Sequence, residues 1–428
     1  MSDSIGISLL GSGNVGAKVL DVLLNDVERH NHIIGAKLKL NSVLVRDVKK
    51  YKKDLPKVNF TDTFDEIVND SDTLIVVELM GGENPAKDYI SKLLKSGKHV
   101  VTANKDVMAK YGSELNDLAI KHNTSIKYEA SVGGGIPIIG PLSRDLLANE
   151  ISSIAAIING TTNFMLSLML SENVSYEDAL KQAQKLGYAE PNPTNDVEGI
   201  DATYKLAILC GLAFHVDVDP AEIYTKGISN IELQDLKYAD ELGYSIKLLA
   251  KADLIDNQLI CLVCPTLIQK SEPLSKVDGV LNAIQLKGDL VEQVILEGPG
   301  AGSSATSSAI LGDVISTAKN IHLSWIESNN VILNKIQINN SGDFQSRFYI
   351  RINVIDEPGV LATIAGIMSK DSISIASVIQ AASDPKKNTA QIVLITHDAS
   401  QKNIDVALDT ISKEKKVDKI FNILPIVD

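Results

Sequence analysis

The sequence predicts an α/β protein made of three parts that follow one another along the chain. The first part alternates short apolar runs with stretches of helical periodicity, beginning with residues 5–10 and the glycine-rich turn GSGNVG. The middle part contains apolar runs joined by short polar turns, and residues 346–428 read as strand, helix, strand, strand, helix and strand. These patterns are typical of a Rossmann-type domain, an α+β domain and a ferredoxin-like βαββαβ domain, respectively.

The composition is that of an ordinary globular protein, with 44% hydrophobic and 22% charged residues in a chain of 428. A net charge of −13, with no basic cluster beyond residues 45–53, argues against nucleic acid as a partner. The three cysteines complete no metal-binding pattern, so we expect reduced thiols in the core. The sequence shows no signal segment and no run of ~20 apolar residues, so we expect a cytoplasmic protein without a membrane partner.

The glycine-rich turn is the first candidate site. Gly11, Gly13 and Gly16 lie between an apolar strand and a helix, which is the pattern of a dinucleotide-binding loop. The first glycine permits the tight turn, the second lets a pyrophosphate approach the backbone, and the third lets the helix pack closely on the strand. The N-terminus of the helix then faces the phosphates. We therefore expect a dinucleotide at this turn.

The next strand, residues 42–47, ends where an NAD-selective site usually offers an acid to the ribose 2′-hydroxyl. Arg46 stands there instead, with Lys49 and Lys50 just beyond, which favours a 2′-phosphate and hence NADP, with NAD as the alternative. A solvated run of charges explains these residues equally well, and the interval from Gly16 is longer than the usual ~20 residues. Asp47 is an alternative partner for a ribose hydroxyl.

Three further strands are expected in the first part, at residues 72–82, 99–105 and 125–135, with helices between them. Ligands of such sheets bind at the carboxyl ends of the strands. Lys105 lies at one of these ends and begins a helix, where a cation is unfavourable unless an anion is near. An ordinary surface lysine is the alternative interpretation.

The middle part is expected to begin with a strand at 152–160, a helix at 161–170 and a second helix opened by Ser175. Two pairs of strands follow. The first pair, 247–255 and 259–268, turns at Asp256-Asn257-Gln258, and the second pair, 281–287 and 289–298, turns at Gly288. These hairpins predict a mixed or antiparallel sheet.

Residues 187–214 contain the most unusual cluster of charges in the chain. Glu190, Asp196, Glu198 and Asp201 crowd into a turn with prolines, and Lys205 follows Asp201 by one helical turn as the sequence becomes apolar. Burial lowers the pKa of a lysine while neighbouring carboxylates raise it, so such a lysine can exchange protons near neutral pH. An ordinary exposed i,i+4 ion pair, worth ~0.3–0.5 kcal/mol, is the alternative.

The remaining segments complete the predicted domain organisation. The glycine-rich stretch 298–302 leads into a helix at 303–320, which we expect to return to the first domain, residues 1–135, and complete it. The second domain then spans residues 136–302. Residues 321–345 are rich in Asn and Ser and are expected to form a linker to the C-terminal domain at 346–428.

Taken in order, the motifs resemble those of homoserine dehydrogenases of the longer form, which carry a C-terminal ACT domain. The resemblance covers nearly the whole chain and lies in GSGNVG, ELMGG (78–82), TANK (102–105), EASVGGGIPII (129–139), NGTTNF (159–164), GYAEPNPTNDVEGIDATYK (187–205), GPGAG (298–302) and DEPGVLATIAGIM (356–368). The chain has Asn192 where the family commonly has Asp, and Asn14 where it has Thr. Neither residue is a proton carrier.

The resemblance implies an interconversion of L-aspartate 4-semialdehyde and L-homoserine, with hydride transfer to or from a nicotinamide. It implies that Lys205 is the general acid/base, assisted by Lys105, and that Glu190 and Asp201 hold the substrate ammonium with support from Asp196. Together with the glycine motif it predicts a set of residues at the cofactor: Gly11, Gly13, Asn14, Val15, Gly16, Arg46, Thr102, Lys105, Gly187 and Gly302.

The resemblance also implies a cation, an effector and an oligomer. Backbone carbonyls around Glu129, Val132, Gly134 and Ile136 would hold Na⁺ or K⁺, although a plain tight turn explains the same glycines. The ACT-like tail implies an amino-acid effector, with threonine as the first candidate, and pairing into a homodimer or homotetramer. A purely structural role in pairing is the alternative for the tail.

Two other classes of function are consistent with parts of the sequence. A nucleotide-responsive regulator would keep both end domains without chemistry, but the intact Glu190, Asp201 and Lys205 argue against it. An aldehyde-oxidising relative would need a nucleophilic cysteine, and neither Cys210 nor Cys261 lies in a suitable loop.

Overall fold

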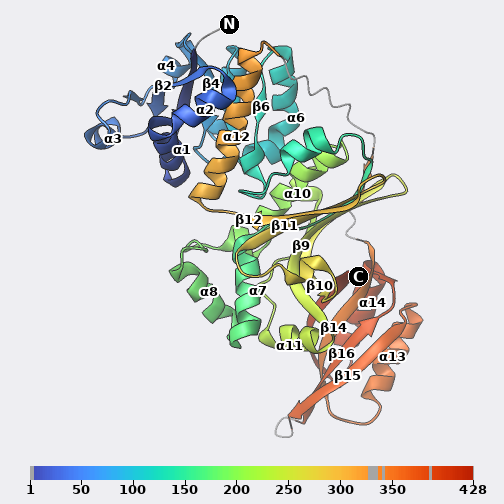
Figure 1. Ribbon diagram of the computed structural model, residues 1–428. Helices are drawn as coiled ribbons and strands as arrows, with labels where there is room; N and C mark the ends of the chain where they lie inside the picture. Colours follow the sequence, from blue (N-terminus) through green and yellow to red (C-terminus); the bar gives the residue numbers. More distant parts are fainter. Residues whose placement is uncertain (1–3, 326–335, 340–342, 385–387, 428) are drawn as a thin grey trace.

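The computed structural model describes residues 4–325, 336–339, 343–384 and 388–427, and its two sheets organise three regions of the chain (Figure 1). The first sheet has six parallel strands in the order β3-β2-β1-β4-β5-β6, which is the doubly wound order of a Rossmann fold. Its strands are β1 (Ser4–Leu10), β2 (Lys37–Leu44), β3 (Phe60–Thr61), β4 (Thr73–Glu78), β5 (His99–Thr102) and β6 (Ile126–Lys127). The predicted Rossmann-type sheet is therefore confirmed.

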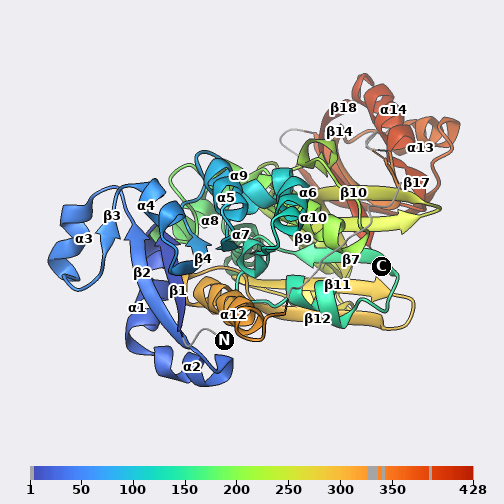
Figure 2. The same cartoon turned by 90° about the horizontal axis from the view of Figure 1, so that it is seen from above.

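Seven helices of the described chain accompany this sheet: α1 (Asn14–Asn25), α2 (Val27–Ile34), α3 (Val48–Asp54), α4 (Phe64–Asn69), α5 (Ala86–Lys95), α6 (Lys105–Lys121) and α12 (Ser303–His322). Although α12 is distant in sequence, it packs against α1, α2, β4 and β5 (Figure 2). Its buried side chains, among them Ile310 and Val314, join the same core as Ile5 and Ile7 of β1. The expected return of this helix to the first domain is what the structure shows.

Two details of the first region differ from the sequence prediction. The strand expected at 125–135 is limited to β6, because Glu129–Ser131 form a 3₁₀ turn and Gly133 and Gly134 have positive φ angles. The strand expected at 42–47 ends earlier, at Leu44, and the basic residues that follow form α3. Arg46 therefore lies in the loop between β2 and α3 rather than in the strand.

The second sheet begins as the predicted antiparallel sheet of the middle region. Its strands there run in the order β12-β11-β7-β9-β10, with bounds β7 (Ile151–Ile157), β9 (Tyr244–Ile255), β10 (Gln258–Gln269), β11 (Leu281–Gly288) and β12 (Glu292–Pro299). Asp256 and Asn257 form the β9–β10 turn with φ angles of 48° and 60°, as a two-residue type I′ turn requires. Gly288 ends β11, and the second turn is formed by residues 289–291.

Five helices of the described residues pack around this sheet: α7 (Gly160–Glu172), α8 (Tyr176–Lys185), α9 (Thr194–Val197), α10 (Ile200–Ala213) and α11 (Leu233–Glu241). Ser175 caps α8 as predicted, because its side chain accepts a hydrogen bond from the amide of Asp178 at 3.2 Å. Helix α10 is apolar on nearly all sides, with Leu206, Leu209 and Cys210 fully buried. Because α10 is buried in this way, the residues of its first turn are held in place.

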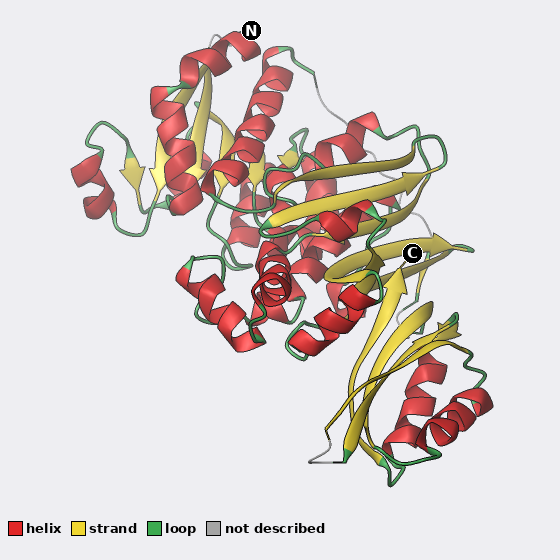
Figure 3. Cartoon of the chain, turned by 60° about the horizontal axis from the view of Figure 1, so that its bottom comes forward, coloured by secondary structure: helices red, strands yellow, loops and turns green. Residues whose placement is uncertain are grey.

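The same sheet continues into the C-terminal region through a parallel pairing of β10 with β18 (Figure 3). That region contains β14 (Gln345–Ile355), α13 (Val360–Lys370), β15 (Ile375–Asp384), β16 (Thr389–Thr396), β17 (Ala399–Ser400), α14 (Gln401–Ser412) and β18 (Val417–Val427). Apart from the two-residue β17, this is the predicted βαββαβ order, with strands arranged β18-β14-β16-β15. The ferredoxin-like domain is confirmed.

The segment predicted as a linker, 321–345, contains some regular structure. Helix α12 extends to His322, and β13 (Gln337–Ile338) pairs with β10. Residues 326–335 and 340–342 lie outside the described residues.

Candidate active site

The acidic turn of residues 190–201 leads directly into α10. Gly199 has a φ angle of 80° and turns the chain into the helix, so that Asp201 falls in its first turn and Lys205 one turn later. Thr203 lies between them and donates from its hydroxyl to the carbonyl of Gly199 at 3.0 Å. The predicted helix and its i,i+4 pair are both present.

Asp201 joins two lysines from different regions of the chain. Its Oδ2 lies 2.7 Å from Nζ of Lys205, and its Oδ1 lies 2.6 Å from Nζ of Lys105, the first residue of α6. The side chains of Asp201 and Lys205 are only 6% and 13% exposed, whereas that of Lys105 is 38% exposed. The ion pair of Asp201 and Lys205 is therefore not the exposed surface pair of the alternative interpretation. Asp201 is also the anion that offsets the unfavourable position of Lys105 at a helix N-terminus.

Asn159 holds the carboxylates in place. It is the N-cap of α7, where its Oδ1 accepts from the amide of Thr162 at 2.9 Å. Its Nδ2 donates to Asp196 at 2.8 Å and to Asp201 at 2.9 Å. The neighbouring carbonyl of Ile158 accepts from Nζ of Lys205 at 2.8 Å. The end of β7 thus orients an aspartate pair and a lysine at one point.

The electrostatics of the cluster follow from burial and proximity. Burial alone would raise the pKa of Asp201, but Lys205 and Lys105 outweigh burial and hold that pKa well below its usual range. Burial alone would lower the pKa of Lys105, yet the charge and hydrogen bond of Asp201 raise it. The pKa of Asp196 is raised, because its burial and the charge of Asp201 outweigh the hydrogen bond from Asn159.

Glu190 lies at the beginning of the acidic turn and is exposed. The backbone carbonyl of Glu190 accepts from the side-chain amide of Gln184 at 3.1 Å, which fixes the turn relative to α8. Gly187, between them, has a φ angle of 77° and no atom within 4 Å of the position of a Cβ, so its backbone is open to approach. The side chain of Glu190 is thus open to solvent.

The three glycines of GSGNVG occupy three different environments. Gly11 has a φ angle of 100°, and a Cβ there would lie 2.9 Å from the carbonyl oxygen of Leu79. A Cβ on Gly16 would lie 2.6 Å from the carbonyl oxygen of Gly11, whereas Gly13 has nothing within 4 Å. Tight turn, open approach and close packing therefore fall on the residues that the motif predicts. The turn fits a pyrophosphate above Gly13, beside Asn14 and Val15 at the beginning of α1.

The other predicted cofactor residues vary in how open they are. Arg46 is exposed beyond β2, while the carboxylate of Asp47 caps α3 by accepting from the amide of Lys50 at 3.1 Å. Asp47 is therefore less available to a ribose hydroxyl than Arg46 is to a phosphate. Thr102 is fully buried and donates from its hydroxyl to Glu78 at 2.6 Å. Gly302, with a φ angle of 108°, begins α12 and has no atom within 4 Å of a Cβ position.

The glycine turn proposed for a cation is built around Glu129. Its Oε1 accepts from the amides of Ile138 and Ile139 at 2.6 and 2.8 Å, and its Oε2 accepts from the amide of Gly140 at 2.7 Å. The carboxylate is thus engaged by the backbone, which leaves carbonyl oxygens as the ligands for any cation at this turn. Val132 and Ile136 are buried in the core, so only their backbone atoms can serve.

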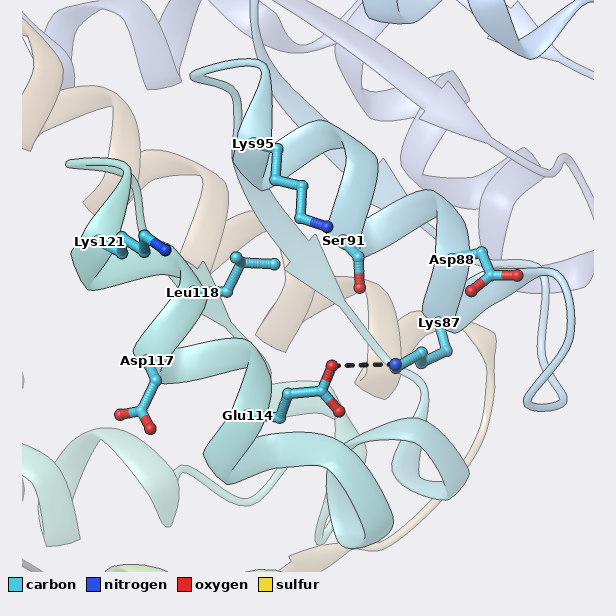
Figure 4. A pocket seen from close by; sticks show the side chains of 8 residues that line it. All are labelled: Lys87, Asp88, Ser91, Lys95, Glu114, Asp117, Leu118 and Lys121. Atoms are coloured by element: carbon cyan, nitrogen blue, oxygen red, sulfur yellow. Dashed lines mark ion pairs between the residues drawn. The ribbon is translucent and has the colours of Figure 1, made fainter.

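A surface hollow of about 330 Å³ lies between α5 and α6 (Figure 4). Lys87 and Glu114 form an ion pair across it at 2.9 Å. Its remaining lining residues are Asp88, Ser91, Lys95, Asp117, Leu118 and Lys121. Acidic and basic groups alternate along it, and it lies on the later turns of α6, away from Lys105 at the beginning of the helix. None of the predicted site residues lines it.

Comparison with known proteins connects this geometry to a family. A family model described as homoserine dehydrogenase matches residues 137–315, one described as its NAD-binding domain matches residues 11–129, and an ACT domain model matches residues 348–415. A homoserine dehydrogenase of Neisseria gonorrhoeae is 38% identical over 424 residues, which are 97% of each chain. The crystal structure of a homoserine dehydrogenase from Thiobacillus denitrificans has 37% identity and a TM-score of 0.93, covering 99% of this chain and 98% of that one.

The chain belongs to the homoserine dehydrogenase family. The resemblance read from the motifs is thereby confirmed, as is its class: homoserine dehydrogenases are NAD(P)-dependent oxidoreductases acting on a CH–OH group. A hyperthermophilic archaeal homoserine dehydrogenase in complex with NADPH has 28% identity and a TM-score of 0.63, covering 76% of this chain and 99% of that one. The NAD-binding match supports a nicotinamide dinucleotide as cofactor.

Two buried polar residues that bond to predicted site residues of this homoserine dehydrogenase were not predicted from the sequence. Asn159 stands in the NGTTNF motif, but only its position as an N-cap, three residues before Thr162, could have marked its side chain as fixed. Glu78, at the end of β4, is fully buried. Burial raises the pKa of its carboxyl group and outweighs the hydrogen bonds from Thr102 and the amide of Met80, which lower it.

Among the helices described, none is long and apolar enough to cross a membrane.

Proposed function

We propose that this member of the homoserine dehydrogenase family interconverts L-homoserine and L-aspartate 4-semialdehyde at the junction of α6, α7 and α10. The observation that carries the proposal is the pairing of Asp201 with both Lys205 and Lys105 at 2.7 and 2.6 Å. A substrate with an oxygen to be protonated or deprotonated needs a positioned proton carrier, and two buried or half-buried ammonium groups meet at this point.

Lys205 is the general acid/base in this account. Asp201 and the carbonyl of Ile158 orient its ammonium, so that one donor direction remains for the substrate oxygen. In homoserine oxidation Lys205 reacts as the neutral amine, whose lone pair takes that third direction and accepts the hydroxyl proton, and in reduction the ammonium returns this proton to the carbonyl oxygen. Lys105 adds a second positive charge beside that oxygen and stabilises the negative charge that develops on it. The nicotinamide, when bound, accepts or supplies the hydride.

The substrate ammonium is received by Glu190 and Asp201, with Asp196 behind them. Because Oδ1 of Asp201 is already paired with Lys105, the ammonium has to share that oxygen or displace the half-exposed lysine. In that case Lys105 moves toward the substrate oxygen, where its charge stabilises the negative charge that develops on that oxygen. Binding of the amino acid and assembly of the proton-transfer site are then one event.

The cofactor is NADP rather than NAD, held by the turn from Gly11 to Gly16 and by Arg46 at the adenosine end. Exposed Arg46, Lys49 and Lys50 suit a 2′-phosphate, and the carboxylate of Asp47, the alternative partner for a ribose hydroxyl, already caps α3. Gly187, Lys105 and Gly302 line the nicotinamide end, whereas Thr102 is fully buried and bonds to Glu78 rather than to the cofactor. The backbone carbonyls of Glu129, Val132, Gly134 and Ile136 would hold a Na⁺ or K⁺ ion.

The ACT domain makes the enzyme responsive to an amino acid, for which threonine is the first candidate. Pairing of two chains into a dimer, or four into a tetramer, accompanies this regulation. Both statements rest on the ACT match at residues 348–415.

The proposed activity is tested by incubating the full chain with L-homoserine and NADP⁺ and following NADPH absorbance. We expect sustained NADPH formation with L-homoserine and none with D-homoserine, which presents its ammonium away from Glu190. An absence of NADPH formation above background with NADP⁺ and with NAD⁺ would refute the function. A parallel titration with L-threonine and L-methionine tests the effector, and equal inhibition by both would remove threonine from that role.

A further inference from the structure

A nine-residue segment, 224–232, connects the active site with the C-terminal domain; we call it the bridge segment. It runs from β8 (Tyr224–Thr225), which pairs with β10, to the residue before α11. On one side it contacts the acidic turn, and on the other it contacts β14 and β18. Residues 224–232 take no part in the proposed chemistry itself.

The contacts on the active-site side hold the turn that carries Asp196. The amide of Ile228 donates to the carbonyl of Val197 at 2.8 Å, and the hydroxyl of Ser229 donates to the carboxylate of Glu198. Gly227 lies so close that a Cβ would overlap the carbonyl oxygen of Val197. Glu198, the one carboxylate of the acidic cluster without a role in catalysis, thus fastens the turn to the bridge segment.

The bridge segment also contacts α10 between its two functional residues. The hydroxyls of Thr225 and Thr203 lie 2.8 Å apart, and Thr203 falls between Asp201 and Lys205 on that helix. A shift of the bridge segment therefore moves both the turn and the first part of α10. Asp196 and Asp201 respond together, because both accept from Asn159.

The contacts on the other side come from the last strand of the C-terminal domain. Nδ2 of Asn422 donates to the carbonyl of Asn230 at 2.8 Å, and Nζ of Lys226 donates to the carbonyl of Ile423 at 3.2 Å. Both partners belong to β18. The bridge segment is thus clamped between β18 and the acidic turn.

A buried charge network anchors the end of the bridge segment. Arg351 of β14 donates from Nε and Nη2 to Asp235 at 2.6 and 3.0 Å, and from Nη2 to Glu232 at 2.7 Å. Asn422 donates to the same Asp235 at 2.7 Å, and Tyr349 does so at 3.2 Å. Arg351 and Asp235 are both fully buried, so α11 and the C-terminal sheet are held in one register.

We propose that the C-terminal domain acts through the bridge segment to position the carboxylates of the acidic turn that bind the substrate ammonium. Asn422 and Lys226 are the positioning residues. A ligand that shifts β18 would then alter binding of the substrate ammonium without touching the cofactor turn. This inference rests on the proposed function of the acidic turn as the substrate site. It assigns the regulatory effect to the affinity for homoserine rather than to the affinity for NADP⁺.

The test measures KM for L-homoserine and KM for NADP⁺ in the full chain and in the variants Asn422→Ala and Lys226→Met. Each variant is expected to raise KM for homoserine about three- to tenfold, the range of mutations that alter coupling between sites, and to leave KM for NADP⁺ within about twofold. Arg351 is left intact, so that Asp235 keeps its charged partner when Asn422→Ala removes the amide bond to it, and Lys226→Met leaves the Asp235 network unchanged. Asn353→Ala is the matched control, since the side-chain amide of Asn353 donates to Asp418 at 2.8 Å, within the C-terminal domain.

A double variant separates transmission through the segment from two independent local effects. Ser229→Ala breaks the contact with Glu198, and combined with Asn422→Ala it should raise KM for homoserine no further than the larger single effect. Unchanged KM for homoserine in both Asn422→Ala and Lys226→Met, or an equal rise in both KM values, overturns the inference. A rise in the Asn353→Ala control overturns it as well. Inactivity of the unmodified chain would instead refute the proposed function.

Discussion

Asp201 is the residue on which the candidate active site depends. Its side chain is almost wholly buried, forms ion pairs with Lys105 and Lys205, and accepts a hydrogen bond from Asn159. A buried carboxylate with two cationic partners keeps its charge, but removing that charge leaves the ammonium groups without a counterion. The same residue is therefore expected to matter for stability and for chemistry.

The charge of Asp201 gives a testable pH dependence. Because its folded pKa is depressed below the ordinary value, its contribution to stability is present above pH ~4 and is lost only as the pH falls through the folded pKa. Asp201→Asn should lower the free energy of unfolding by about 2–4 kcal/mol, by the same amount at pH 5 and at pH 8. Urea unfolding at the two pH values measures this. A difference that vanishes at pH 5 would contradict the depressed pKa.

Arg46 tests the cofactor assignment at the level of one side chain. Arg46→Ala should raise KM for NADPH about tenfold or more, the loss expected for one charge-assisted contact with a phosphate, while changing KM for NADH little. The control is Arg29→Ala, an exposed arginine of α2 distant from the end of β2 in sequence. Equal losses with the two cofactors would defeat the assignment of a 2′-phosphate.

At the scale of elements, the glycine turn separates stability from binding. Gly13→Ala introduces a methyl group into open space, with a φ angle of −72° that alanine adopts, so the free energy of unfolding should change by less than ~0.5 kcal/mol. Its KM for NADP⁺ should nevertheless rise, because the methyl group blocks the approach of the pyrophosphate. Gly16→Ala should instead destabilise the fold, since its Cβ would press on the carbonyl of Gly11.

Thermal unfolding and KM for NADP⁺, measured on both variants, test these expectations for stability and for binding. A stable Gly13→Ala variant with unchanged KM for NADP⁺ would show that the pyrophosphate lies elsewhere.

The elements that the sequence predicted correctly are those with strong local patterns. The buried runs of β1, β4 and β5, the capped helix α8 and the Asp256-Asn257 turn are each specified by adjacent residues. Short amphipathic or charged helices such as α2, α3 and α4 were not predicted, because pieces of six to eight residues depend on packing rather than on periodicity. Their packing partners are not visible in the local sequence.

At the scale of the whole molecule, the structure adds a continuity that the domain boundaries did not suggest. Strand β10 of the middle region pairs with β18, and the face of the C-terminal sheet opposite α13 and α14 buries Tyr349, Leu424 and Ile426 in the main core. The C-terminal domain is therefore not a tethered appendage. Such long-range pairing has no sequence pattern of its own, and neither does the meeting of Lys105 with Asp201, which are distant in the chain.

This continuity predicts the outcome of removing the C-terminal domain. A chain that ends at residue 339 exposes the β10 edge together with Leu262 and Cys264 of β10, which are buried in the core of the C-terminal domain, so its apparent Tm should fall by at least ~5 °C and it should bind a hydrophobic dye. Differential scanning fluorimetry and size-exclusion chromatography measure both effects. A truncated chain that is monodisperse with an unchanged Tm would contradict the role given to the shared sheet.

The central claim is that Lys205, oriented by Asp201, moves the proton at the substrate oxygen. The most direct test is the turnover of Lys205→Ala with L-homoserine and NADP⁺ at saturating concentrations, beside the exposed-lysine control Lys181→Ala. We predict a fall in kcat of about 10²- to 10⁴-fold for Lys205→Ala with KM for NADP⁺ nearly unchanged, and wild-type turnover in the control. A Lys205→Ala variant that retains most of its turnover would contradict the account.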